Sequence, residues 1–293
     1  MVGAVSGKRR GDEARKPNGP LTPREVRKFR KVIYNYYSEH GRELPWRQTQ
    51  DPYRIVVSEI MLQQTQVERV AEKYPGFTRQ FPNFRALADA PLRDVLTAWQ
   101  GLGYNRRAAS LKKMGEIVAE VHGGRLRADV DFLTKLPGIG YNTACAILAF
   151  AFNKPVVFIE TNIRTVFIHY FFPERDAVRD DEILSLVDRT LDCENPCAWY
   201  SALMDYGTML KKTHGSINPR SAHYQKQSPF KGSDRQVRGM VLKAIIDHHR
   251  LTDEEIAETL QLPFERARKA LDALQKEGFV REQEGRYSIA GEV

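Results

Sequence analysis

The sequence predicts an all-α domain over residues 21–211 and a small α+β domain over residues 233–293, joined by a basic linker over residues 212–232. Apolar residues recur at helical spacing through the first domain, and strand-like segments are scarce outside the C-terminal end. Between the two domains the composition becomes polar and basic, with Pro and Gly as helix breakers. We expect residues 1–20 to form a disordered basic tail.

The helices of the first domain are bounded by recognisable start signals and loops. Thr22-Pro23-Arg24-Glu25 has the pattern of a capping box with proline at the first helical position, and Asp51-Pro52 opens a second helix. Pro and Gly residues mark the loops between helices. Further helices are expected near residues 67–80, 91–100, 104–122, 141–152, 161–172, 180–191 and 197–211.

The second domain shows three helical segments followed by a hairpin pattern. Residues 235–249 are amphipathic, Thr252 caps a short helix, and residues 263–275 form a third helix. Residues 278–289 have the pattern of a β-hairpin. This order resembles a winged helix-turn-helix, and a small protein-docking module is the alternative. In the first interpretation the third helix presents Glu265, Arg266, Arg268 and Lys269 to DNA.

Charge and cysteine content restrict the class of protein. The chain has 293 residues with 45 Lys and Arg against 37 Asp and Glu, so its net charge of +8 favours a polyanionic partner, nucleic acid before membrane. No apolar stretch is long enough to span a membrane, and no apolar segment follows the basic N-terminus as in a signal peptide. Cys145, Cys193 and Cys197 cannot all pair and indicate no metal site. We expect a cytoplasmic, nucleoid-associated monomer.

The segment 136–144 reads Leu-Pro-Gly-Ile-Gly-Tyr-Asn-Thr-Ala and predicts a tight turn between two helices. Gly138 and Gly140 can adopt backbone angles that other residues avoid, and Ile139 between them can pack into the core. Backbone N–H groups at the start of the following helix can approach an anion closely. The segment therefore predicts a clamp for the phosphate backbone of a nucleic acid.

Two glutamates stand where cleavage of an N-glycosidic bond in DNA would need carboxyl groups. Such a reaction requires an extruded base, a proton donor to that base and an ionised carboxylate near the sugar. Glu59 lies in an apolar helix that turns abruptly polar, and Glu160 follows an apolar run at the start of a helix. Gln63, Gln64 and Tyr104 are candidate contacts to the bases. We expect Glu59 and Glu160 to meet across one extruded nucleotide.

At this point the motifs resemble one family, the MutY-type adenine DNA glycosylases, a branch of the helix-hairpin-helix (HhH-GPD) superfamily with endonuclease III and the thymine mismatch glycosylases. The likeness covers roughly residues 25–212 and implies a helix-hairpin-helix DNA glycosylase domain. The segments that carry it, in chain order, are 44–47, 51–53, 59–66, 99–104 and 136–144.

The resemblance also assigns roles to single residues. It implies that Glu59 protonates adenine, that Tyr104 is the minor-groove wedge and that Gln64 contacts bases beside the lesion. Glu160 falls on the family's catalytic aspartate, and Asn162 on the asparagine that supports it. The residues expected to bind DNA are Gln63, Gln64, Tyr104, Gly138, Gly140, Tyr141, Asn142 and Thr143.

Two departures from the family bear on cofactors and reaction type. Asn142 falls where bifunctional relatives carry a Schiff-base lysine, so a covalent lyase step is not expected. Residues 208–231 contain no cysteine, so the family's four-cysteine iron–sulfur cluster is not expected. The resemblance implies that a monovalent cation could bind the backbone of Leu136–Gly140 as the only cofactor.

The sequence thus predicts a monofunctional DNA glycosylase of base excision repair that acts on double-stranded DNA. It would hydrolyse the N-glycosidic bond of a flipped mispaired base, with adenine in A·G or A·8-oxoG as the first candidate. One alternative is a mismatch glycosylase that removes uracil or thymine opposite guanine. Another is a catalytically inactive DNA-binding damage sensor or regulator. The glutamate at position 160 and the loss of the iron–sulfur cluster loop favour it, while the presence of both Glu59 and Asn162 argues against it.

Overall fold

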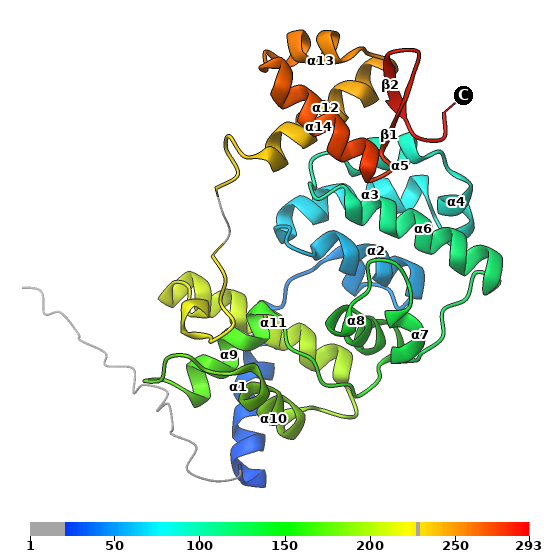
Figure 1. The fold of residues 1–293 in the computed structure, drawn as a ribbon. Coiled ribbons are helices and arrows are strands. Elements are labelled where there is room, and N and C mark those ends of the chain that lie inside the picture. The colour runs from blue at the N-terminus through cyan, green and yellow to red at the C-terminus, as the bar shows by residue number, and fades with distance from the viewer. Residues whose placement is uncertain (1–20, 227–228, 293) are drawn as a thin grey trace, which may run out of the picture. The chain divides into compact units, whose positions relative to one another are not determined.

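A computed structural model describes residues 21–226 and 229–292 of the chain (Figure 1). The predicted tail over residues 1–20 lies outside the described residues. Within the described part, the chain forms fourteen α-helices, two short 3-10 helices and one two-stranded sheet. The prediction of a mostly helical chain with a small C-terminal sheet is therefore confirmed.

Contacts between residues divide the chain into two compact units. Among the described residues, the first consists of those up to Arg42 together with Lys154–Gln225, and the second of Glu43–Asn153 together with those from Lys226 onward. The C-terminal helices and strands thus belong to the same unit as the middle of the predicted all-α domain. The predicted domain boundaries stay predictions.

The first unit is built on an aromatic core. Phe29 contacts the rings of Phe167, Phe171 and Trp199 edge-on, with centroids 5.1–5.8 Å apart. Such edge-to-face pairs add to the stabilisation from apolar burial. The helices of this unit are α1 (Pro23–His40), α9 (Thr161–Phe171), α10 (Asp180–Thr190) and α11 (Pro196–His214), followed by the 3-10 helix η2 (Asn218–Arg220).

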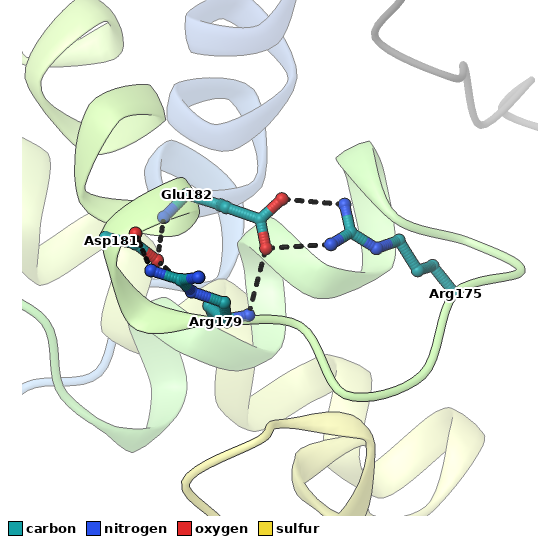
Figure 2. Close-up of polar contacts among 4 residues, drawn as sticks. All are labelled: Arg175, Arg179, Asp181 and Glu182. Atoms are coloured by element: carbon teal, nitrogen blue, oxygen red, sulfur yellow. Dashed lines mark hydrogen bonds and ion pairs between the residues drawn. The ribbon is translucent and has the colours of Figure 1, made fainter.

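Side-chain hydrogen bonds support the starts of α1 and α10. The predicted capping box of α1 is present, because the Thr22 N–H donates to Glu25 Oε2 at 2.8 Å and the Glu25 N–H donates to Thr22 Oγ1 at 3.3 Å. At α10, the Arg175 guanidinium donates two hydrogen bonds to Glu182, whose Oε2 also accepts the Arg179 N–H (Figure 2). This second cluster is largely exposed, so water screens its ion pairs and each adds little to stability.

The start of the predicted linker makes tertiary contacts in the first unit. α11 continues to His214, three residues past the expected end of the all-α domain at residue 211. Beyond it, Ile217 is buried, and Val178 forms an isolated β-bridge with Ser221. The Arg220 guanidinium donates to backbone carbonyls, including that of Arg175 at 2.7 Å. Residues 217–221 therefore pack against the first unit.

The second unit contains the remaining helices of the predicted all-α domain. Helix α2 packs on both α3 and α8, and α4 packs on α6 (Figure 1). The short helices α4 and α7 were not predicted, because five or six residues are too few to show a helical period. The elements are the 3-10 helix η1 (Pro45–Arg47) and the helices α2 (Pro52–Leu62), α3 (Val67–Gln80), α4 (Phe84–Asp89), α5 (Leu92–Trp99), α6 (Arg106–Val121), α7 (Val130–Thr134) and α8 (Tyr141–Phe152).

The C-terminal elements follow the predicted order of three helices and a hairpin. They are α12 (Asp234–His248), α13 (Asp253–Leu260), α14 (Phe264–Lys276), β1 (Val280–Gln283) and β2 (Arg286–Ile289). The strands are antiparallel, with Gln283 opposite Arg286. Glu284 and Gly285 between them both have positive φ, 54° and 74°, as a two-residue type I′ turn requires.

Arg93 of α5 ties these C-terminal elements to the helices before them. Its side chain is almost buried, and its guanidinium donates to the carbonyl of Ile246 and to Glu292, with 2.6 Å between Arg93 Nη2 and Glu292 Oε2. The hydrogen bond from Arg93 holds the pKa of the Glu292 carboxyl below its ordinary value. Glu277 makes a second tie, since it accepts from both Arg106 of α6 and Arg238 of α12.

We expect Glu292→Gln to lower the free energy of unfolding by about 1 kcal/mol at neutral pH, because a charge-assisted hydrogen bond is lost at a partly exposed site. The pKa of Glu292 is lowered in the folded state, so its contribution is complete above the ordinary glutamate pKa of about 4.3 and is lost as the pH falls through the folded value. The measurement is denaturant unfolding at several pH values.

The matched control is Glu284→Gln, the same change at an exposed turn position. The difference between Glu292→Gln and the parent should shrink on acidification. A constant difference from pH 7 to pH 3 would contradict the assigned ion pair.

Candidate functional site

The turn between α7 and α8 is the predicted glycine hairpin. Gly138 has φ +81°, and a Cβ at this position would meet the Ser110 Cβ at 3.0 Å, so only glycine fits. Ile139 is buried, and its N–H donates to the Leu136 carbonyl at 3.2 Å, as expected for an anchor in the core. Gly140 has φ −90°, which any residue adopts, and a Cβ there would meet nothing within 4 Å. The expectation of an unusual backbone angle at Gly140 is therefore wrong.

The start of α8 presents polar groups to solvent. Tyr141 and Asn142 are exposed, and Thr143 is half-buried. The first amides of an α-helix have no acceptor within the helix, and the helix dipole makes this end partly positive. The geometry is therefore suited to bind an anion at the exposed hairpin.

The C-terminal end of α2 carries Glu59 and leads directly into the hairpin. Glu59 is partly exposed, between the fully buried Ser58 and Ile60, one turn before Gln63. Gln63 Nε2 donates to the Gly138 carbonyl and to Thr143 Oγ1, each at 3.2 Å. The structure therefore brings the turn after α2 and the glycine hairpin together.

Gln64 and Tyr104 occupy two tight turns. Gln64 has φ +55° and is exposed directly after α2. Tyr104 has φ +49° and follows Gly101 and Gly103, whose φ values are +91° and +72°. Tyr104 is 40% exposed. Positive φ at residues other than glycine costs about 1 kcal/mol or more, which indicates that surrounding contacts impose both turns.

Arg107 supplies those contacts, and the sequence did not identify it as a site residue. Its Nη1 donates to the Ile60 and Met61 carbonyls at 2.9 Å each, and to the carbonyl of Gln63. Its Nη2 donates to the Gly103 carbonyl at 3.0 Å. Burial lowers the pKa of Arg107 to about 10. The Arg107 guanidinium thus holds the end of α2 next to the turn before Tyr104.

Glu160, in the first unit, is the N-cap of α9. Its Oε1 accepts the backbone N–H groups of Asn162 and Ile163 at 2.8 and 3.1 Å. Burial raises the pKa of the Glu160 carboxyl, although these two amides and the charge of Lys211 act in the opposite direction. The two backbone amides therefore hold the carboxylate in one place at the start of α9, where Glu160 is only partly exposed.

Lys211 and Gly207 of α11 support the start of α9, and the sequence did not predict either role. Lys211 Nζ donates to Asn162 Oδ1 at 2.6 Å, and burial lowers the pKa of this lysine. A Cβ on Gly207 would lie only 2.4 Å from the Asn162 carbonyl oxygen. The absence of a side chain at position 207 is what lets α11 pack against Asn162.

The predicted site residues fall into two groups, one in each unit. Glu59, Tyr104 and the hairpin belong to the second unit, whereas Glu160 and Asn162 belong to the first. The expected meeting of the two glutamates across an extruded nucleotide stays a prediction. Within residues 21–226 and 229–292, no group of three or more His, Cys, Asp or Glu residues is arranged to hold a metal ion. In the same described part, every helix is too short or too polar to cross a membrane.

The family model and the most similar known proteins point to the same family. Residues 57–187 match the model of the HhH-GPD superfamily base excision DNA repair proteins. An adenine DNA glycosylase of Mycolicibacterium smegmatis is 33% identical over 280 residues, which cover 89% of this chain and 95% of the relative. A Buchnera aphidicola adenine DNA glycosylase is 37% identical over 62% of this chain, which spans about half (52%) of its length. The solved structure of a thermostable thymine-DNA glycosylase matches with a TM-score of 0.55 and 25% identity, over 63% of this chain and 88% of that one.

We expect Gly207→Ala to lower the free energy of unfolding by about 1–3 kcal/mol, because the new methyl group forces α11 away from Asn162. Gly239→Ala on α12 is the matched control, since a Cβ there meets nothing within 4 Å. Replacing that helical glycine should stabilise the protein by about 0.5–1 kcal/mol. Denaturant unfolding measures both, and equal stability of Gly207→Ala and the parent would contradict the close packing.

Proposed function

The chain belongs to the HhH-GPD superfamily of base excision DNA repair proteins, and we propose that it is a monofunctional DNA glycosylase that removes adenine mispaired with guanine or 8-oxoguanine. The choice of adenine is supported by the similarity to the M. smegmatis adenine DNA glycosylase over nearly the full length of both chains. The structural observation that supports the proposal is the pair of hydrogen bonds from Gln63 to Gly138 and Thr143, because they join the end of the Glu59 helix to the glycine hairpin.

The proposed DNA grip uses backbone groups. The first amides of α8 would donate to a phosphate, and Gly140, beside which the protein leaves space for a side chain, would allow that phosphate to approach closely. The carbonyls of Leu136 and Gly138 each accept one hydrogen bond and keep a second lone pair, so a monovalent cation fits there as part of the proposal. The partner is double-stranded DNA, and the expected location is the cytoplasmic nucleoid.

The proposed reaction divides the work between two carboxyl groups. Glu59 gives its proton to the extruded base as the N-glycosidic bond breaks, so the bonding electrons leave with a neutral base. Glu160 in its ionised form stabilises the positive charge that develops on the sugar. Water then adds to C1′ and loses a proton, which leaves an abasic site. Asn142 at the start of α8 provides no amine for a covalent step.

The glutamate at position 160 differs from the aspartate that the family resemblance implies. The two amides that bind Oε1 fix the longer side chain at the start of α9 and so offset the freedom that one extra methylene brings. Lys211 fixes the Asn162 amide from the other side. This support favours a working carboxylate over a retired one.

A second candidate keeps the fold and removes thymine or uracil opposite guanine. The similarity to the solved thymine-DNA glycosylase favours it, at 25% identity. As a further part of the proposal, the three helices and hairpin at the C-terminus act as a winged helix-turn-helix, in agreement with their order and register.

We expect the purified protein to cleave, after alkali, duplexes that carry A·G or A·8-oxoG, and Glu59→Gln to slow this cleavage by at least about a hundredfold. An amide of the same size cannot supply the proton, whereas DNA affinity should remain. The measurement is single-turnover cleavage of labelled duplexes together with binding by fluorescence anisotropy.

The panel of duplexes also separates the candidates. Cleavage restricted to U·G or T·G would show that the protein removes uracil or thymine instead of adenine. Binding without cleavage of any duplex would identify an inactive sensor. A normal cleavage rate for Glu59→Gln would remove Glu59 from the mechanism.

We expect the cleavage rate to decrease as the pH falls, because Glu160 must be ionised. The midpoint of this decrease should lie above the ordinary glutamate pKa of about 4.3, because burial raises the pKa of Glu160. Lys211→Met removes a positive charge that favours the ionised form, so the acidic limb should move to higher pH. Arg164, the other cation that acts on Glu160, is paired with Asp180 and stays in place. The measurement is the single-turnover rate from pH 4.5 to pH 8.

The matched control is Lys212→Met, which removes the same charge from an exposed neighbouring position. Its acidic limb should coincide with that of the parent. If the two lysine variants have identical pH profiles, Lys211 does not act on Glu160.

A further inference from the structure

An arginine of the C-terminal elements contacts the predicted wedge residue. Arg235, in the first turn of α12, donates from Nη1 to the hydroxyl of Tyr104 at 2.8 Å. Its guanidinium also lies 5.9 Å from the centre of the Tyr104 ring, and Arg107 lies 5.5 Å from the same ring. The ring of Tyr104 is therefore held by one arginine from α6 and one from α12.

Arg235 joins Tyr104 to a second exposed aromatic ring. Phe230 is 61% exposed, and its ring centre lies 5.9 Å from the Arg235 guanidinium. The three side chains form an aromatic–cation–aromatic row, which we call the Tyr104–Arg235–Phe230 strip. Aromatic faces that stack on bases, combined with a guanidinium that binds phosphate, are the side-chain types used to hold unpaired nucleic acid.

The position of Arg235 is fixed by the ties described above. Arg93 binds Glu292 and the end of α12, and Arg238 of α12 shares Glu277 with Arg106. The hydrogen bond from Arg93 to the Ile246 carbonyl joins α12 to α5, and the shared Glu277 connects α12 to α6, so α12 is linked to the helices on either side of the Tyr104 turn. The strip is therefore part of one packed unit.

The basic side chains of α14 bind acceptors in and directly before the other C-terminal elements. Lys269 Nζ donates to Asp234 at 2.8 Å, Arg266 donates to the Gly232 carbonyl at 2.9 Å, and Arg268 pairs with Asp253. Carboxylates from the same C-terminal elements thus offset much of the positive charge of the expected recognition helix.

We infer that the Tyr104–Arg235–Phe230 strip is a DNA-binding surface through which the C-terminal elements take part in base extrusion. The inference rests on the proposed function. Tyr104 enters the space that the extruded base vacates, and Arg235, with five N–H donors, binds a backbone phosphate beside that space while it holds the tyrosine hydroxyl. Phe230 packs against the exposed sugar and base edge of the neighbouring nucleotide. The C-terminal elements are thereby a working part of the lesion-binding surface.

The test compares Arg235→Ala with Arg250→Ala. The second variant removes the same charge from an exposed arginine that follows the C-terminal end of α12. The probe is a duplex with a central A·G mispair and 2-aminopurine beside the adenine. We expect Arg235→Ala to reduce the slope of log Kd against log salt by about 1 and to weaken the fluorescence increase that reports unstacking. Arg250→Ala should match the parent in both measurements.

Tyr104→Phe separates the hydrogen bond from the ring. It keeps the wedge and removes the hydroxyl that Arg235 binds, so its effect on the fluorescence increase should not add to that of Arg235→Ala in the double variant. Equal thermal unfolding of all variants excludes a folding defect. Full additivity would show that the two side chains act separately and would overturn the coupled part of the inference.

The outcomes distinguish this inference from the proposed function. If the parent protein cleaves the A·G duplex and Arg235→Ala equals Arg250→Ala in slope and fluorescence, the inference is overturned and the proposed function stands. If the parent cleaves no duplex and Arg235→Ala still lowers the slope and the fluorescence increase, the strip is supported as a DNA-binding surface and the proposed function fails.

Discussion

The guanidinium of Arg107 is the contact on which the geometry of the second unit's candidate residues depends. An α-helix ends with carbonyl groups that have no partner within the helix. At the end of α2 these carbonyls converge on Arg107, which also binds the Gly103 carbonyl in the turn before Tyr104. A planar fork with five donors suits this task, and a lysine could not replace it. Arg107 therefore fixes the backbone at the end of the helix that carries Glu59 and Gln63, and the turn before Tyr104.

The first unit uses the same principle at the opposite end of a helix. There the start of α9 carries Glu160 and Asn162, and α11 provides both the cation and the space that fix them. In each unit a basic side chain from a neighbouring helix organises a helix terminus that carries a candidate carboxylate. Rigid helices, rather than long loops, thus determine the placement of the proposed reactive groups.

Local features were predictable from the sequence, and long-range contacts were not. The capping box at Thr22, the buried Ile139 and the two-stranded C-terminal hairpin depend on neighbouring residues, so the sequence pattern contains them. Arg107 and Lys211 reach partners more than forty positions away, and nothing in the local pattern separates them from the other Lys and Arg residues of the chain. Gly140 was expected to need a special backbone angle, but its glycine serves nothing within the protein itself.

The role of Glu160 as a helix cap has a thermodynamic consequence. An ionised carboxylate accepts hydrogen bonds from the first amides of α9 more strongly than a protonated one does. Uptake of a proton therefore loosens the first helical turn, and by linkage any ligand that tightens this turn draws the proton off. The order of the first turn of α9 and the protonation of Glu160 are thus coupled, so a ligand that binds next to this turn would shift both.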